Sequence, residues 1–201
     1  FSTFLNNNEG RFLKSNIDDI ANELIDWQTS LVSQHNNSFK KEVVASNNLK
    51  TTLYHLCPLA TGERRRYLFI PTKNEWVAFF DNGHVGTDRT SPKIIGKKLS
   101  AQTIYISYNL SSEETSFEYY NKESGVFELT RSIATVKESK WGFHQYGKPL
   151  NFEKTENYKL RKIKDRFNLG LLKKYLNEFD ISAFNEDFYL IKENAILITK
   201  Q

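Results

Sequence analysis

Asp81, His84 and Asp88 are the residues whose types and spacing come nearest to acid–base or metal-binding chemistry. They lie in the stretch NEWVAFFDNGHVGTDRTSP, residues 74–92. A carboxylate and an imidazole at the end of one strand could transfer a proton or hold a cation. The spacing matches neither the alternating oxygen ligands of a calcium loop nor a zinc site with paired histidines.

Backbone geometry offers a second interpretation of the same stretch. Asn82-Gly83 is a strong signal for a tight turn, because both residues tolerate a positive φ. Asp88, followed by Ser91-Pro92, is typical of a loop that leads into a helix. We favour this turn-and-cap interpretation, and a catalytic site at Asp81 and His84 stays an alternative.

His55 and Cys57 form the next candidate pair, since cysteine and histidine together can make a nucleophile. The stretch LKTTLYHLC, residues 49–57, alternates well enough to predict a strand. Residues two apart in a strand are separated by about 6.6 Å, which exceeds the hydrogen-bond reach that a working pair needs. A partner from elsewhere, His84 or His144, stays open, and we expect Cys57 to be a buried thiol.

The chain lacks the common sequence motifs of catalysis and cofactor binding. It contains no G-x-S-x-G, no phosphate-binding glycine loop, no dinucleotide fingerprint and no H-E-x-x-H. The single cysteine, Cys57, excludes an internal disulfide and a cysteine-based zinc site. We therefore expect no cofactor and no metal. One unpaired thiol fits the reducing cytoplasm, and no apolar run approaches the roughly 18 residues of a membrane span.

Hydrophobic periodicity predicts an α+β fold with a mostly antiparallel sheet, in a single domain over residues 1–201. We expect residues 1–14 to be loosely ordered and residues 15–32 to form a helix capped by Ser15. Two consecutive helices near the C-terminus should precede a final hairpin. The other predicted elements are strands over 49–57, 64–70, 75–80, 102–110, 115–121, 125–137 and 140–147, helices over 91–99, 155–167 and 168–179, and the hairpin over 188–200. Short turns between successive strands favour antiparallel pairing.

The most informative physical signal is the distribution of charge. The whole chain carries a net charge of +4, whereas Lys148 to Lys174 alone has nine basic residues against three acids. In a helix over 156–167, Lys159, Lys162 and Arg166 would share one stripe. Two further groups could join a positive binding surface: Arg64, Arg65 and Arg66, and the rings of Trp141 and Tyr146. The alternative explanation is a solvated helix face on which the aliphatic parts of the lysine and arginine side chains pack over aromatic rings.

These observations favour a non-enzymatic module that binds another protein, because the motif search found no catalytic signature. The most concrete form is a bacterial toxin-neutralising protein of the immunity type. One alternative is a binder of nucleic acid or another anion through the basic helix predicted over 156–167. The other is a small enzyme with a site near His84 and Asp81.

Overall fold

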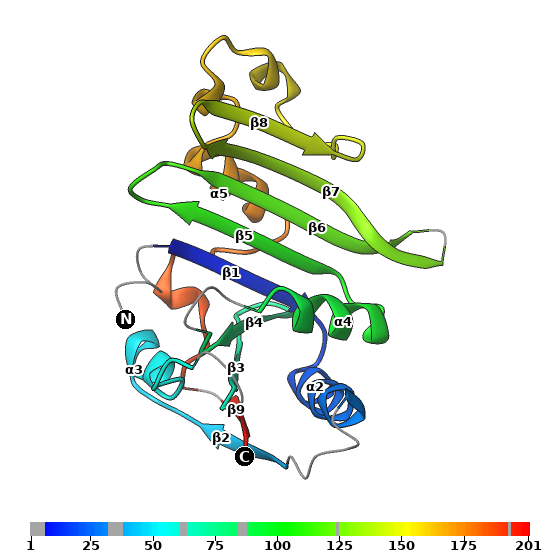
Figure 1. Ribbon diagram of the computed structural model, residues 1–201, viewed down its shortest axis with the longest axis vertical. Helices are drawn as coiled ribbons and strands as arrows, with labels where there is room; N and C mark the ends of the chain where they lie inside the picture. The colour runs from blue at the N-terminus through cyan, green and yellow to red at the C-terminus, as the bar shows by residue number, and fades with distance from the viewer. Residues whose placement is uncertain (1–6, 32–37, 61–63, 84–87, 124, 193) are drawn as a thin grey trace. The chain divides into compact units, whose positions relative to one another are not determined.

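The computed structural model describes residues 7–31, 38–60, 64–83, 88–123, 125–192 and 194–201 (Figure 1). The chain divides into two compact units. Unit 1 comprises Phe1–Arg11 and Gln102–Phe184, and unit 2 comprises Phe12–Ala101 and Asn185–Gln201. Strand β1, Asn7–Lys14, contributes residues to both units.

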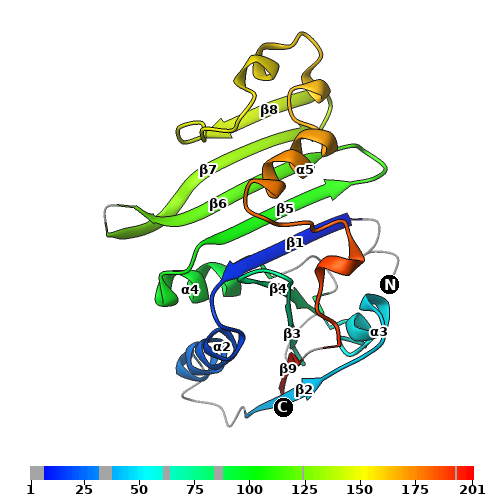
Figure 2. The ribbon, with the colours of Figure 1, turned by 180° about the vertical axis from the view of Figure 1, so that it is seen from behind.

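Unit 1 consists of antiparallel strands with one helix against a face of the sheet. Its strands follow the order β1–β5–β6–β7–β8, and the pairs from β5 to β8 are all antiparallel. Figure 2 shows α5 in front of these strands. The bounds are β5 Thr103–Asn109, β6 Thr115–Glu123, β7 Val126–Lys137, β8 Trp141–Tyr146 and α5 Leu169–Asn177, with short 3-10 helices η1 Thr155–Lys159 and η2 Ile163–Asp165.

Unit 2 has a second run of strands, in the order β2–β9–β3–β4. Each pair in this run is antiparallel. The bounds are β2 Phe39–Val44, β3 Arg66–Pro71, β4 Trp76–Asp81, β9 Ala195–Lys200, α2 Ile17–Leu31, α3 Leu49–Tyr54, α4 Thr90–Leu99 and the 3-10 helix η3 Glu186–Phe188. No helix among the described residues is long and apolar enough to cross a membrane.

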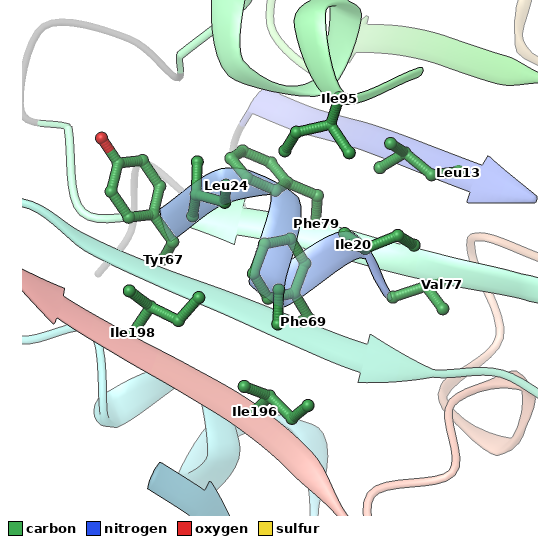
Figure 3. Packing of buried hydrophobic residues seen from close by; sticks show 11 residues of the cluster. Leu13, Ile20, Leu24, Tyr67, Phe69, Val77, Phe79, Ile95, Ile196 and Ile198 are labelled. Atoms are coloured by element: carbon green, nitrogen blue, oxygen red, sulfur yellow. The ribbon is translucent and has the colours of Figure 1, made fainter. Parts of the chain in front are cut away.

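The core of unit 2 lies between its strands and the helices α2 and α4 (Figure 3). Val77 and Phe79 point into this cluster from β4 and are almost completely buried. Phe80 points to the other face, where its ring lies 6.3 Å from that of Tyr189. Because both faces of β4 are covered, the strand can be an uninterrupted apolar run.

The structure confirms the α+β class and the mostly antiparallel sheet. The strands β3 and β4 form the predicted hairpin, and α4 contains Pro92 in its first turn. Helix α5 begins as expected, because Asn168 Oδ1 accepts a hydrogen bond from the backbone N–H of Leu171 at 3.1 Å. All four strands predicted between residues 102 and 147 are present as β5 to β8.

Two predictions at the N-terminal end were wrong. Residues Asn7–Lys14 form strand β1, although loose order was expected for residues 1–14. The cap of α2 is Asn16 rather than Ser15, since Asn16 Oδ1 accepts from the backbone N–H of Asp18 at 2.8 Å. Strand β2 was not predicted, because its half-exposed sequence FKKEVV follows a polar stretch and carries two lysines.

The strand predicted over residues 49–57 was also wrong, because this segment begins with helix α3. Asn48 Oδ1 caps the helix by accepting from the backbone N–H and the hydroxyl of Thr51, at 2.8 and 2.9 Å. The buried Thr52, Leu53 and Leu56 follow helical spacing. A run this short fits both the strand and the helical periodicity, and the cap at Asn48 favours the helix.

Two C-terminal predictions differ from the structure. Residues 155–167 do not form an α-helix, because Leu160 and Lys162 adopt extended ψ values of 142° and 107° between η1 and η2. The last residues do not form a hairpin. Strand β9 pairs with β2 and β3, while Tyr189 makes a single bridge to Thr72.

Candidate functional site

Unit 1 buries an ion pair between Arg131 of β7 and Glu153 of the segment after β8. Both side chains have an exposed fraction of 0%. Arg131 Nε donates to Glu153 Oε1 at 2.8 Å, and Nη2 donates to Oε2 at 2.7 Å. Two parallel hydrogen bonds give such a pair both strength and a fixed geometry. Burial by itself lowers the pKa of Arg131, but the hydrogen bonds and charge of Glu153 raise it above its ordinary value.

The remaining donors of Arg131 hold the end of β8. Its Nη1 donates to the carbonyl oxygens of Tyr146 and Gly147 at 3.0 and 2.9 Å, and Nη2 donates to Gln145 Oε1 at 3.0 Å. Gly147 has a φ of 80°, and a Cβ there would collide with the carbonyl oxygen of Thr130. Glycine is therefore required at the point where the chain turns away from the sheet.

Two tyrosines extend this network toward α5. The hydroxyl of Tyr158 donates to Glu153 Oε2 at 2.7 Å and lies 3.0 Å from the hydroxyl of Tyr175. The Tyr175 oxygen accepts from the backbone N–H of Lys154 at 2.9 Å. Burial, followed by the hydrogen bonds to Tyr175 and Glu153, raises the pKa of Tyr158. The segment after β8 is thus fixed to β7 and α5 by buried polar contacts.

The outward side of this segment is strongly cationic. Tyr158 is buried, whereas the next four residues are all exposed. The exposed side chains of this segment include four cations and one acid, Glu156. We call the exposed cations together with Leu160 the cationic ridge: Lys154, Lys159, Leu160, Arg161 and Lys162. Of the three acids between Lys148 and Lys174, Glu153 is neutralised in the interior by Arg131. The exposed surface is therefore more positive than the sequence count suggests.

Some cations near the ridge already have anionic partners. Lys164 Nζ donates to Glu113 Oε2 at 2.7 Å, and this hydrogen bond and charge lower the pKa of Glu113. Lys162 Nζ lies 3.6 Å from Asp165 Oδ2, which makes a longer and solvent-exposed pair. Among the described residues, Lys154, Lys159 and Arg161 have no ion-pair partner.

The predicted stripe of Lys159, Lys162 and Arg166 does not exist as a helix face, because this segment is not an α-helix. Lys159 and Lys162 are exposed, but Arg166 is half-buried. Its Nε donates to the carbonyl of Leu160 at 2.8 Å, and its guanidinium carbon lies 5.8 Å from the centre of the Phe143 ring. Arg166 therefore supports the ridge rather than forming part of its exposed surface.

The two aromatic candidates of β8 have different surroundings. Trp141 is half-buried, and Lys137 Nζ lies 6.0 Å from the centre of its ring. Tyr146 is 59% exposed. Phe143 packs against Tyr158 with ring centres 5.1 Å apart, so the alternation of β8 directs Tyr146 to the opposite face.

Asp81 and Asp88 of unit 2 do lie together, and their oxygens accept hydrogen bonds from the backbone. Asp81 has an exposed fraction of 0%. Its Oδ1 accepts from the backbone N–H of Gly83 at 2.7 Å and from Arg65 Nη1 at 3.2 Å. Its Oδ2 accepts from the backbone N–H of Asp88 at 2.8 Å.

Asp88 in turn begins helix α4. Its Oδ1 accepts from the backbone N–H groups of Thr90 and Ser91 at 2.8 and 3.1 Å, and Oδ2 accepts from the hydroxyl of Ser91. These contacts confirm the cap at Asp88. The tight turn predicted at Asn82-Gly83 was wrong, because Asn82 does not have a positive φ and Gly83 continues into a parallel bridge with Ala60. His84 lies outside the described residues, and the catalytic alternative around it stays a prediction.

His55 and Cys57 do not share a strand face, because they follow helix α3. His55 ends the helix, and Cys57 is half-buried, not fully buried as expected. The carbonyl oxygens of both residues accept hydrogen bonds from Arg66 Nη1.

The three consecutive arginines therefore have three different surroundings. Arg66 binds backbone carbonyls, Arg65 pairs with Asp81, and only Arg64 has an exposed side chain. They belong to unit 2, whereas the cationic ridge belongs to unit 1. The positive surface that would combine both groups stays a prediction.

Sequence reasoning missed the network that holds the ridge. Arg131 was part of a predicted strand, and Glu153 was only one of the three acids counted between Lys148 and Lys174. One signal was present: Arg131 shares a strand face with the buried Ile133 and Thr135, which is an unusual place for a cation without a partner. The identity of that partner could not be predicted, because Glu153 is 22 residues away.

Among the described residues, no group of three or more histidine, cysteine, aspartate or glutamate side chains is arranged to hold a metal ion. Comparison of the chain with protein families, with curated proteins and with solved structures found no match.

Proposed function

We propose that this chain is a non-enzymatic module that binds another protein through the cationic ridge. The observation that carries the proposal is the contrast between the two sides of residues 153–162. On the inner side, Arg131 neutralises Glu153 in a fully buried pair. On the outer side, Lys159 and Arg161 are exposed with no ion-pair partner among the described residues.

This arrangement suits recognition, because the ridge is held in place before any partner arrives. Tyr158, whose hydroxyl donates to Glu153, immediately precedes the exposed residues. A surface that is fixed in advance loses less conformational entropy on binding. Exposed charges of one sign also accelerate association with a partner of the opposite sign.

The enzyme alternative has less support from the geometry. The described oxygens of Asp81 and Asp88 accept hydrogen bonds from backbone groups, which accounts for their position without chemistry. A toxin-neutralising protein of the bacterial cytoplasm is the most concrete form of the proposal. Its target would present an acidic surface, since a strongly basic toxin would be repelled by the ridge.

A capture experiment with paired baits tests the proposal. The intact chain, the variant K159E/R161E and the control K50E/K73E are immobilised and exposed to lysate of the source organism. Lys50 and Lys73 are exposed residues of unit 2, so the control has the same change in net charge. We expect a defined protein on the intact chain and the control, and its loss from K159E/R161E.

The captured protein is then purified and its affinity for each variant is measured by calorimetry. We expect K159E/R161E to weaken binding at least tenfold and K50E/K73E to leave it within about twofold. Equal capture by all three baits would contradict the proposed surface. A difference that disappears when the lysate is treated with nucleases would assign the ridge to nucleic acid instead.

A further inference from the structure

Leu160 stands in the middle of the cationic ridge with 42% of its surface exposed. Lys159 and Arg161 flank it, and both are exposed. A single exposed leucine is ordinary on a protein surface. Here, however, the apolar residue is directly preceded and followed in the chain by cations without ion-pair partners among the described residues, so a ligand bound along this segment would meet both kinds of contact.

The backbone of Leu160 is held on both sides. Its N–H donates to the carbonyl of Asn157 at 3.0 Å, and its carbonyl accepts from Arg166 Nε at 2.8 Å. Arg166 is positioned in turn over the ring of Phe143. Leu160 is thus exposed on a fixed backbone, which is the property of an anchor residue rather than of a loosely attached loop.

The surroundings of Leu160 favour a peptide over a nucleic acid. Binding of single strands usually requires exposed rings on which bases can stack. At the ridge, Tyr158 is buried, and Phe143 is half-buried beneath Arg166. The exposed ring of Tyr146 belongs to the opposite face of β8.

We infer that the occupant of the cationic ridge is an acidic segment of a partner protein, with an apolar residue between two carboxylates. The carboxylates pair with Lys159 and Arg161, and the apolar residue covers Leu160. This inference rests on the proposed function and adds the chemistry of the partner. The charge complementarity and the exposed leucine between the cations carry it.

Three labelled probes of equal charge test this chemistry by fluorescence anisotropy with the full chain. The first is a peptide in which leucine lies between glutamates, the second has serine in place of leucine, and the third is single-stranded oligo-dT. We expect the leucine peptide to bind about tenfold more tightly than the serine peptide, the range expected for burial of one aliphatic anchor. Oligo-dT should bind more weakly than the leucine peptide.

Two variants separate the apolar contact from the charges. L160S should bind the two peptides equally within about twofold, whereas K159E/R161E should lose both. K50E/K73E serves as the matched control and should behave like the intact chain. Thermal unfolding of each variant verifies that the fold is retained, because all the substituted side chains are exposed.

The outcomes distinguish the inference from the proposed function. Equal binding of both peptides to the intact chain, or tighter binding of oligo-dT, would overturn the inference. If a captured partner still required Lys159 and Arg161 in that case, the proposed function would stand without it. If the leucine peptide bound as expected but no lysate protein distinguished the baits, the inferred chemistry would stand and the proposed function would fail.

Discussion

The clusters around Arg131 in unit 1 and around Asp81 in unit 2 each enclose a buried charge. They differ in how far apart in the sequence their contacting residues lie. Asp81 accepts hydrogen bonds from Gly83 and Asp88, which are two and seven residues away. Arg131 binds Glu153, which is 22 residues away. The first cluster connects the end of β4 with the start of α4, whereas the second fixes one segment of the chain upon another.

The two clusters also differ in their access to solvent. Arg65, the cationic partner of Asp81, has 30% of its side chain exposed, whereas Arg131 and Glu153 are both at 0%. Removing two ions from water is costly, and the mutual attraction compensates only when every donor finds an acceptor. In unit 1 that condition is met by Gln145, Tyr146 and Gly147. A buried ion pair therefore requires a fixed position of the segment that carries the ridge.

The largest effect is expected from Arg131→Met, because it leaves the carboxylate of Glu153 buried without its cation. Breaking a buried pair in this way lowers the free energy of unfolding by about 3–5 kcal/mol. The double variant R131M/E153M should recover most of that loss, since no charge remains in the interior. Urea unfolding followed by circular dichroism measures both values. A double variant as unstable as the single one would show that the hydrogen bonds to β8 matter more than the charge.

Asp81→Ala should have a smaller effect of about 2 kcal/mol. The substitution removes the acceptor for the backbone N–H groups of Gly83 and Asp88, and buried donors without partners cost about 1–3 kcal/mol. Arg65 is partly exposed and can turn to water, so it adds little. The same urea experiment, with Arg65→Met as the control, tests this assignment. A loss as large as that of Arg131→Met would remove the difference between the two clusters.

The sequence predicted the contacts that depend on neighbours in the chain. The hairpin of β3 and β4 and the caps at Asp88 and Asn168 all lie within a few residues of their signals. The tight turn expected at Asn82-Gly83 is a local exception, because Gly83 makes a parallel bridge to Ala60. Helix α3 was another local exception, because a run of six residues fits both the helical and the strand periodicity. Helix caps and the pairing of successive strands were therefore the most reliable guides to the fold.

Contacts between distant residues account for what could not be predicted. The charged residues of 155–167 do follow helical spacing, but Tyr158 is held inward by Glu153 and Tyr175, and an extended Leu160 interrupts the helix. Strand β9 lies between β2 and β3, which neighbouring turns could not indicate. Of the ridge cations, Lys159 and Lys162 were predicted from the sequence as binding residues. Lys154 and Arg161 were not, and neither was the buried network that positions the ridge.

The N-terminal caps of α4 and α5 allow the same kind of substitution to be compared in the two units. Asp88→Ala removes the acceptor at the start of α4, and Asn168→Ala removes the one at the start of α5. Loss of such a cap lowers stability by about 1 kcal/mol. We expect the Asp88 variant to lose slightly more free energy of unfolding. The backbone N–H of residue 88 also donates to Asp81, and loss of the cap would disturb that contact. Equal losses in urea unfolding would show that the cap is independent of the hydrogen bond between Asp88 and Asp81.

The smallest effect near neutral pH should come from Tyr67→Phe. Tyr67 is a buried residue of β3 whose hydroxyl interacts with the charges of Asp88 and Asp81, so its ionisation distinguishes the two clusters only at alkaline pH. Burial, followed by the charge of Asp88, raises the pKa of Tyr67 from its ordinary value of 10.0 to about 12. The folded chain thus holds this proton more tightly than the unfolded chain, so stability is unaffected below about pH 10 and falls as the pH rises toward 12. At pH 11 the contribution lost is about 1 kcal/mol. In the Tyr67→Phe variant this part of the alkaline decline should be absent, as measured by urea unfolding at pH 8 and pH 11. An alkaline decline in Tyr67→Phe equal to that of the intact chain would show that Tyr67 is not the group that titrates.

Tyr158→Phe should, in contrast, lower the free energy of unfolding at both pH values, because Tyr158 donates to Glu153 wherever its hydroxyl is protonated.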